Sequence, residues 1–147
     1  MSHNLGYHPT TTTIVPHMTA RIEISYGELL DKITILEIKS ERIAESAKLA
    51  NVSAELAALN AAWVEIPGQA QSEELSTLRT ELKATNEKLW EIEDDIRELE
   101  RQQSFDETFI ALARSVYFTN DRRAALKKRV DQCLGSRFSE EKSYKPY

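Results

Sequence analysis

A heptad repeat of apolar residues between positions 75 and 99 is the clearest pattern along the chain. Successive positions alternate between spacings of three and four, which is the period of a helical seam that packs against another helix. The positions are Leu75, Leu78, Leu82, Thr85, Leu89, Ile92, Ile96 and Leu99. The pattern predicts about 40 Å of uninterrupted helix, with Thr85 as the only polar residue of the seam.

A second long helix is predicted from Phe105 towards Leu134, after the tight turn RQQS. Ser104 and Glu107 have the spacing of a capping box, which satisfies unpaired backbone N–H groups of the first turn. Gly135 is a suitable stop, because glycine adopts the left-handed conformation easily. The predicted face consists of Phe109, Leu112, Val116, Thr119, Arg123, Leu126, Val130 and Cys133. The short connection predicts that the two helices form an antiparallel hairpin.

Two shorter helices are predicted before this hairpin. Ser25 and Glu28 have capping-box spacing, and Glu28 with Lys32 is a favourable i,i+4 pair. The first helical face consists of Leu29, Ile33, Leu36, Ser40, Ile43 and Ala47. A break is predicted at residues 51–53, and the second face consists of Val52, Leu56, Leu59, Trp63 and Ile66. Residues 67–72 read as a loop, because Pro and Gly end one helix and Ser72 can cap the next.

The predicted fold class is therefore all-α, an elongated helical bundle built on a long antiparallel helical hairpin. Residues 20–25 alternate apolar and polar side chains, which predicts one short N-terminal extended segment. Residues 1–18 read as a flexible leader or a cloning-derived segment, and they contain all three histidines. Residues 19–135 form a single helical bundle domain, and residues 136–147 form a polar C-terminal tail.

Composition narrows the class of protein further. The net charge of −5 argues against general nucleic-acid binding. No apolar run approaches the roughly 20 residues that span a bilayer, so no membrane insertion is expected. Cys133 is the single cysteine and cannot form an internal disulfide, which fits a cytoplasmic protein. Histidine-based triads are not expected, because no histidine lies outside the leader.

The apolar face of each predicted hairpin helix is interrupted by polar residues, at Thr85 in the first helix and at residues 119–121 in the second. The two interruptions fall at the same level of the hairpin. With a turn centred near Gln103, facing residues have numbers that sum to roughly 206, which places Thr85 opposite Asp121. The polar layer so predicted is the candidate ligand-binding site. Its residues are Thr85, Asn86, Glu87, Arg114, Tyr117, Asn120, Asp121, Arg123 and Lys127.

Three interpretations of this layer remain open. Polar residues in a helical seam often fix register and partner orientation. Arginine, asparagine and tyrosine side chains also suit an anion pocket for a phosphate or carboxylate. The third interpretation is a loop at residues 119–121, because Asn120 and Asp121 can cap a new helix.

A magnesium site is a weaker alternative, and otherwise no cofactor is predicted. Glu37 and Glu41 are spaced i,i+4, and Glu91 and Asp94 are spaced i,i+3. Two such carboxylate pairs on facing helices can hold Mg²⁺, as in all-α nucleotide pyrophosphohydrolases. The similarity to those enzymes is one of spacing only.

Four stretches together resemble an uncharacterised bacterial helical domain family over about residues 22–144. They are GELLDKITILEIKSERI, ELKATNEKLWEIEDDIRELE, FDETFIALARSVYFTNDRRAALKKRV and GSRFSEEKSY. The resemblance implies domains encoded beside, or fused to, glycosyltransferases and other surface-glycan enzymes. It carries no established catalytic residues.

Two hypotheses of function follow. The first is a cytoplasmic helical accessory or interaction module, a homodimer with coiled-coil-like helices, linked to lipopolysaccharide or capsule assembly and to the enzymes of that process. The second is a small all-α enzyme or binding protein for a phosphorylated or carboxylated metabolite such as a nucleotide-sugar, with Mg²⁺ as an optional cofactor. The sequence alone leaves open whether the protein is an enzyme.

Overall fold

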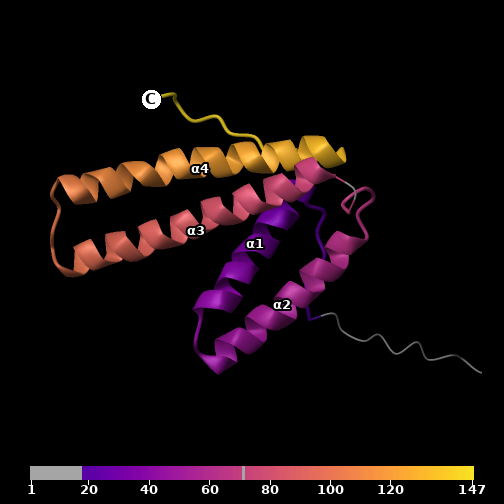
Figure 1. Cartoon of the computed structure of the whole chain (residues 1–147), viewed down its shortest axis with the longest axis horizontal. Coiled ribbons are helices and arrows are strands. Elements are labelled where there is room, and N and C mark those ends of the chain that lie inside the picture. Colours follow the sequence, from indigo (N-terminus) through magenta and orange to yellow (C-terminus); the bar gives the residue numbers. More distant parts are fainter. Residues whose placement is uncertain (1–17, 71) are drawn as a thin grey trace, which may run out of the picture.

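The computed structural model describes residues 18–70 and 72–147, and these residues form four helices (Figure 1). The helices are α1 (Tyr26–Arg42), α2 (Ser46–Val64), α3 (Glu73–Arg101) and α4 (Glu107–Leu134). The all-α prediction is confirmed. Residues 20–25 precede α1 as irregular chain, so the predicted extended segment forms no strand within the described residues. The predicted leader lies outside the described residues except for Met18.

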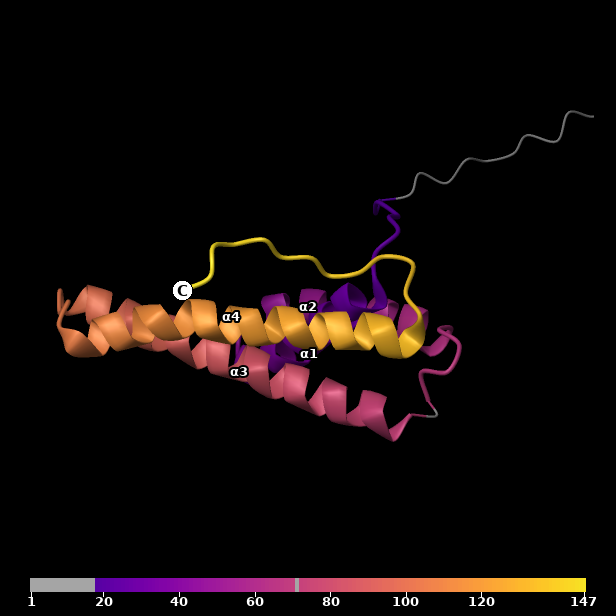
Figure 2. The same ribbon diagram turned by 90° about the horizontal axis from the view of Figure 1, so that it is seen from above.

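Helices α3 and α4 lie side by side in opposite directions and form the long hairpin seen in both views (Figures 1 and 2). The Ser72 side chain accepts from the Leu75 N–H and caps α3. The cap of α4 is Asp106, which accepts from the N–H groups of Thr108 and Phe109, so the predicted Ser104 cap is wrong. An aspartate bonds these amides equally well and adds a negative charge at the positive end of the helix.

Helix α4 runs without interruption through residues 119–121, so the predicted loop there is wrong. It ends at Gly135, which adopts the left-handed conformation with φ of 64°. Continuous helix keeps the polar side chains of this stretch on fixed faces of α4, rather than on a loop that could rearrange.

The connection between α1 and α2 lies earlier than the sequence predicts. Helix α1 ends at Arg42, Ile43 is extended, and α2 begins at Ser46, whereas the break was expected at residues 51–53. No glycine or proline marks this turn. Packing of α2 back along α1, which buries Val52 and Trp63, outweighs the helical propensity of the connecting residues.

The core lies where α1 crosses one half of the hairpin (Figure 1). The fully buried Leu30 and Ile33 of α1 belong to the same apolar cluster as Leu78, Leu82 and Val130. The other half of the hairpin projects beyond α1 and α2 (Figure 1). Residues 89–95 still lie beside α1, where Glu91 pairs with Arg42 and Trp90 lines a cleft with Ile38. We therefore call residues 96–118 the distal hairpin.

The C-terminal tail turns back and runs along α4 (Figure 2). Lys142 Nζ and the Tyr147 hydroxyl each donate to Asp121 at 2.6 Å. These two hydrogen bonds hold the pKa of Asp121 below its ordinary value of 3.8. Residues 136–147 are therefore attached to the bundle through α4. No helix of the described residues is both long and apolar enough to cross a bilayer.

Candidate functional site

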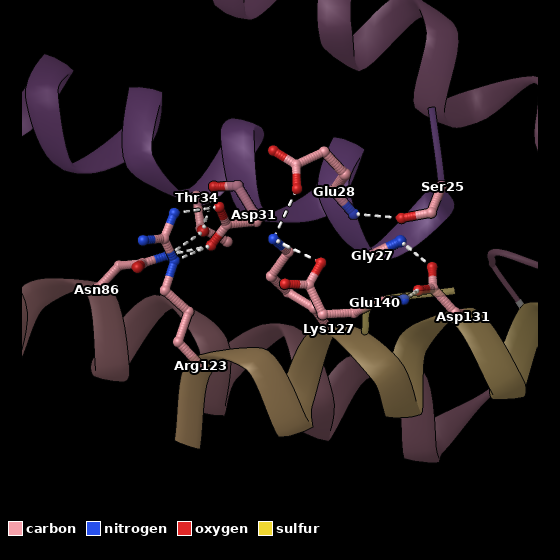
Figure 3. A network of polar contacts seen from close by, with 10 residues as sticks. All are labelled: Ser25, Gly27, Glu28, Asp31, Thr34, Asn86, Arg123, Lys127, Asp131 and Glu140. Carbon is pink, nitrogen blue, oxygen red and sulfur yellow. Dashed lines mark hydrogen bonds and ion pairs between the residues drawn. The ribbon is translucent and has the colours of Figure 1, made fainter. Parts of the chain in front are cut away.

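Asp31 of α1 is the most deeply buried charged residue among the described residues, with 1% of its surface exposed (Figure 3). Its carboxylate accepts two parallel hydrogen bonds from Arg123 of α4, at 2.9 Å from Nε and 2.5 Å from Nη2. Asn86 of α3 donates to the same carboxylate at 2.9 Å and to the Thr34 hydroxyl at 3.1 Å. One carboxylate thus joins three helices through a paired guanidinium and an amide.

A second ion pair lies one turn further along the same interface (Figure 3). Lys127 Nζ lies 2.6 Å from a Glu28 oxygen and 3.0 Å from a Glu140 oxygen, and its side chain is almost fully covered. Burial opposes the charged form of Lys127, but the hydrogen bonds from its ammonium to Glu28 and Glu140 outweigh that effect and raise its pKa above 10.5. The predicted i,i+4 pairing of Glu28 with Lys32 is wrong, because Glu28 turns towards α4.

A third contact holds the first turn of α1 against the end of α4. Asp131 accepts from the Gly27 N–H at 2.6 Å and from the Glu140 N–H at 3.0 Å. A Cβ atom at position 27 would clash with the Lys127 carbonyl oxygen and crowd Asp131. Glycine is therefore required here for close approach of the two backbones. We call these linked contacts the α1 polar network, and its residues are Gly27, Glu28, Asp31, Thr34, Asn86, Arg123, Lys127, Asp131 and Glu140.

The structure brings together only part of the predicted polar layer. Asn86, Arg123 and Lys127 belong to the α1 polar network, and Asn120 lines a cleft beside Asn86 and Arg123. Thr85 lies with Thr119 in a shallow pocket between α3 and α4, so its predicted placement opposite Asp121 is wrong. A shift of two positions moves a helical residue to another face.

The remaining predicted residues lie on other surfaces. Tyr117 and Asp121 face the C-terminal tail, and Arg114 Nε donates to the Tyr117 hydroxyl at 3.3 Å. Glu87 lines a separate pocket with Lys83 and Glu37. The predicted layer is therefore divided among at least three faces of the hairpin.

The four carboxylates of the magnesium alternative each have other surroundings. Glu37 pairs with Arg79 and more distantly, at 3.9 Å, with Lys83. Glu41 pairs with Lys83, and Glu91 pairs with Arg42. Asp94 lines the cleft beside Asn120. In the part of the chain that the structure describes, no group of three or more His, Cys, Asp or Glu side chains could hold a metal ion.

The α1 members of the network were missed by sequence reasoning, although the sequence carries a signal for them. Gly27, Asp31, Thr34 and Ile38 follow spacings of four, three and four, in parallel with the apolar stripe of α1. All four are buried. A charged residue on such a stripe indicates a buried partner on another element, because an unpaired buried charge is very costly.

Each cation of the network already faces a carboxylate of the chain itself. Arg123 faces Asp31, Lys127 faces Glu28 and Glu140, and no buried side-chain polar atom lacks a partner among the described residues. The guanidinium fork that could bind an anion already holds a carboxylate. The arrangement therefore fixes α1 on the hairpin, which agrees with the register interpretation of the polar layer.

Stability at alkaline pH tests the Lys127 pairs. A raised pKa means that the folded state holds the Lys127 proton more tightly than the unfolded state does. The stabilisation of the fold by the Lys127 pairs is therefore complete below pH 10.5 and is lost as the pH rises through the higher pKa of the folded state. We expect the urea midpoint of the wild type to fall more steeply than that of Lys127→Met between neutral pH and about pH 11. If the urea midpoints of the two proteins fell in parallel with pH, the Lys127 pairs would contribute nothing to the stability of the fold.

Comparison with known proteins identifies a family. A family model described as "Family of unknown function (DUF6165)" matches residues 20–146. The expectation of an uncharacterised domain family is confirmed. No curated protein and no solved structure matches the chain.

Proposed function

The chain belongs to the family of unknown function DUF6165, and because that description carries no activity, we propose from the geometry that the protein is a helical interaction module that dimerises through its distal hairpin. The supporting observation is the exposure of large apolar side chains on this part of the molecule. Phe105 and Ile110 are 49% and 55% exposed, and Tyr117 and Phe118 are still 41% and 42% exposed although Tyr147 of the tail packs on both rings. Contiguous apolar surface marks interaction sites, and this part of the hairpin is where we expect such a surface.

The heptad seam of the distal hairpin supports the same proposal. Ile96 and Leu99 of α3 and Phe109 and Leu112 of α4 remain half-buried, because no third helix covers them. In the other half of the hairpin, α1 completes the packing around Leu78 and Leu82. A two-helix layer gains stability when its apolar stripe is covered by further helices.

A second copy of the chain is the occupant that we propose. Two distal hairpins placed side by side form a four-helix bundle, in which the same surface of each copy meets the other about a two-fold axis. The half-buried seam residues of both copies would then form its core. This proposal gives the predicted homodimer a definite interface.

The proposal is preferred to the anion-binding alternative because of the charge arrangement. Arg123 and Lys127 are the most buried cations of the predicted site, and both face carboxylates of the chain itself. A phosphate or carboxylate ligand that took the paired hydrogen bonds of Arg123 would have to displace Asp31, which would leave a buried carboxylate without a partner.

Sedimentation velocity measures the expected dimer directly. We expect Ile110→Glu to weaken dimerisation at least about tenfold, because burial of an isoleucine contributes about 1.5–3 kcal/mol. Val64→Glu is the matched control, since Val64 is a 61% exposed aliphatic residue on α2, away from the distal hairpin. A monomeric wild type, or equal weakening by both variants, would exclude this interface.

The cellular setting is proposed from the resemblance to domains that accompany surface-glycan enzymes. We propose that the dimer acts in the cytoplasm beside enzymes of lipopolysaccharide or capsule assembly. Deletion of the gene in its bacterium should alter the surface-polysaccharide profile, with rescue by Val64→Glu and not by Ile110→Glu. An unchanged profile in the deletion strain would reject this setting and leave the dimer interface to be judged by sedimentation.

A further inference from the structure

A cleft of about 570 Å³ lies between the second half of α1 and the hairpin. Ile35 and Ile38 of α1 with Leu89 and Trp90 of α3 form its apolar lining. This volume is within the roughly 300–1,000 Å³ of small-molecule sites, which are largely apolar with a few polar groups. We call it the Trp90 cleft.

The polar side of the Trp90 cleft is formed by groups that the α1 polar network leaves partly unused. Asn86 and Arg123 both line the cleft. Figure 3 shows the Asn86 amide oxygen and one terminal nitrogen of Arg123 turned away from Asp31. Within residues 18–70 and 72–147, neither Asn86 Oδ1 nor Arg123 Nη1 has a hydrogen-bond partner. Neither atom is buried without a partner, so both are accessible to solvent, and both side chains line the cleft.

This pair of groups sets the chemistry of a ligand. Arg123 Nη1 can only donate and Asn86 Oδ1 can only accept, and a hydroxyl group satisfies both because it donates and accepts. A carboxylate has only acceptor oxygens, so it would leave the Asn86 oxygen facing a negative charge. A phosphate would likewise place at least one negative charge beside that oxygen. The Asp31 carboxylate behind Arg123 weakens attraction for an anion further.

The rim of the cleft also favours a neutral ligand. Glu93 and Arg97 form an ion pair with each other, and the nearby Asp94 carboxylate adds a negative charge. Asn120 contributes a second amide, which both donates and accepts. Trp90 contributes an aromatic surface on which the C–H face of a sugar ring can pack.

We propose that the Trp90 cleft binds a neutral pyranose sugar. Trp90 lies against one face of the ring, Asn86 and Arg123 bond its hydroxyl groups, and Asn120 bonds a further hydroxyl. Asp31 holds Arg123 in place before the ligand arrives, so little ordering of this side chain opposes binding. The inference does not depend on the proposed dimer.

The two tryptophans provide an internal control for the test. Trp63 is 5% exposed in the core cluster, whereas Trp90 lines the cleft. Their indole N–H signals in a ¹H–¹⁵N spectrum are followed during titration with N-acetylglucosamine, with methyl α-mannopyranoside, and with inorganic phosphate. At least one sugar is expected to shift the Trp90 signal saturably at millimolar concentration, while the Trp63 signal stays in place and phosphate has no effect.

Two variants separate specific binding from nonspecific effects. Asn120→Ala removes a cleft amide outside the α1 polar network and is expected to weaken sugar binding about three- to tenfold. Ile110→Glu, which tests the dimer, is expected to leave the Trp90 response unchanged because Ile110 does not line the cleft. The proposal is overturned if neither sugar shifts Trp90, if phosphate alone does, or if Asn120→Ala binds the sugar as the wild type does.

Discussion

Replacement of Asp31 by alanine is expected to lower the free energy of unfolding by about 3–5 kcal/mol. The substitution leaves the Arg123 guanidinium and the Asn86 amide without the carboxylate to which both donate. An uncompensated charge in a mostly buried place costs far more than the net contribution of the original pair. Urea unfolding followed by circular dichroism measures the loss as a lower midpoint at an unchanged slope.

Two comparisons sharpen this prediction. Arg122→Ala breaks the exposed pair between Arg122 and Glu81, and it should cost no more than about 1 kcal/mol. Combining Asp31→Leu with Arg123→Met replaces the whole pair by apolar side chains and should recover much of the stability, since no charge is then left alone. Equal losses for Asp31→Ala and Arg122→Ala would contradict the account of a buried network.

Gly27→Ala is expected to destabilise the fold by about 3 kcal/mol, although the same change stabilises an ordinary helix by about 0.5–1 kcal/mol. The added methyl group would meet the Lys127 carbonyl oxygen, and moving α1 away from α4 would weaken the hydrogen bond from the Gly27 N–H to the Asp131 carboxylate. The sign of the effect is therefore diagnostic of close contact between α1 and α4. Thermal unfolding of the two proteins measures it.

Gly135→Ala is the comparison for this prediction. Gly135 has a positive φ of 64°, but no atom lies within 4 Å of a Cβ placed there. That change should cost only the backbone strain of about 1–2 kcal/mol. A Gly27→Ala protein as stable as the wild type would show that α1 does not lie this close to α4 in solution.

The helices of the hairpin could be predicted well because their signals are local. The heptad seam of α3, the cap at Ser72 and the stop at Gly135 depend on neighbours within a few residues, and all three are observed. The turn between α1 and α2 was misplaced because residues 43–45 carry no glycine or proline. Its position is decided by how α2 packs on α1, which no local pattern encodes.

The candidate site could be predicted only in part for a related reason. Asn86, Arg123 and Lys127 were identified because they interrupt or flank an apolar seam. Their partners Asp31 and Glu28 lie on α1, and nothing in the sequence specified which face of the hairpin α1 would cover. Counting residues from the turn places Thr85 opposite Asp121, but Thr85 lies beside Thr119, two positions earlier. That difference is enough to place Asp121 on another face of α4, beside the C-terminal tail.

The α1 polar network joins the first helix of the bundle to the last, and this has a consequence for the order of folding. Asp31 and Arg123 are separated by 92 positions, and Gly27 and Asp131 by 104. During synthesis, α1 leaves the ribosome long before the residues that neutralise its buried carboxylate exist. The hairpin closes through local contacts, and α1 also packs on α2 and α3, but the pair between Asp31 and Arg123 can form only on a nearly finished chain. The Asp31 carboxylate therefore has no cation of α4 to pair with until α4 has emerged, and its neutralisation by Arg123 is a late step of folding.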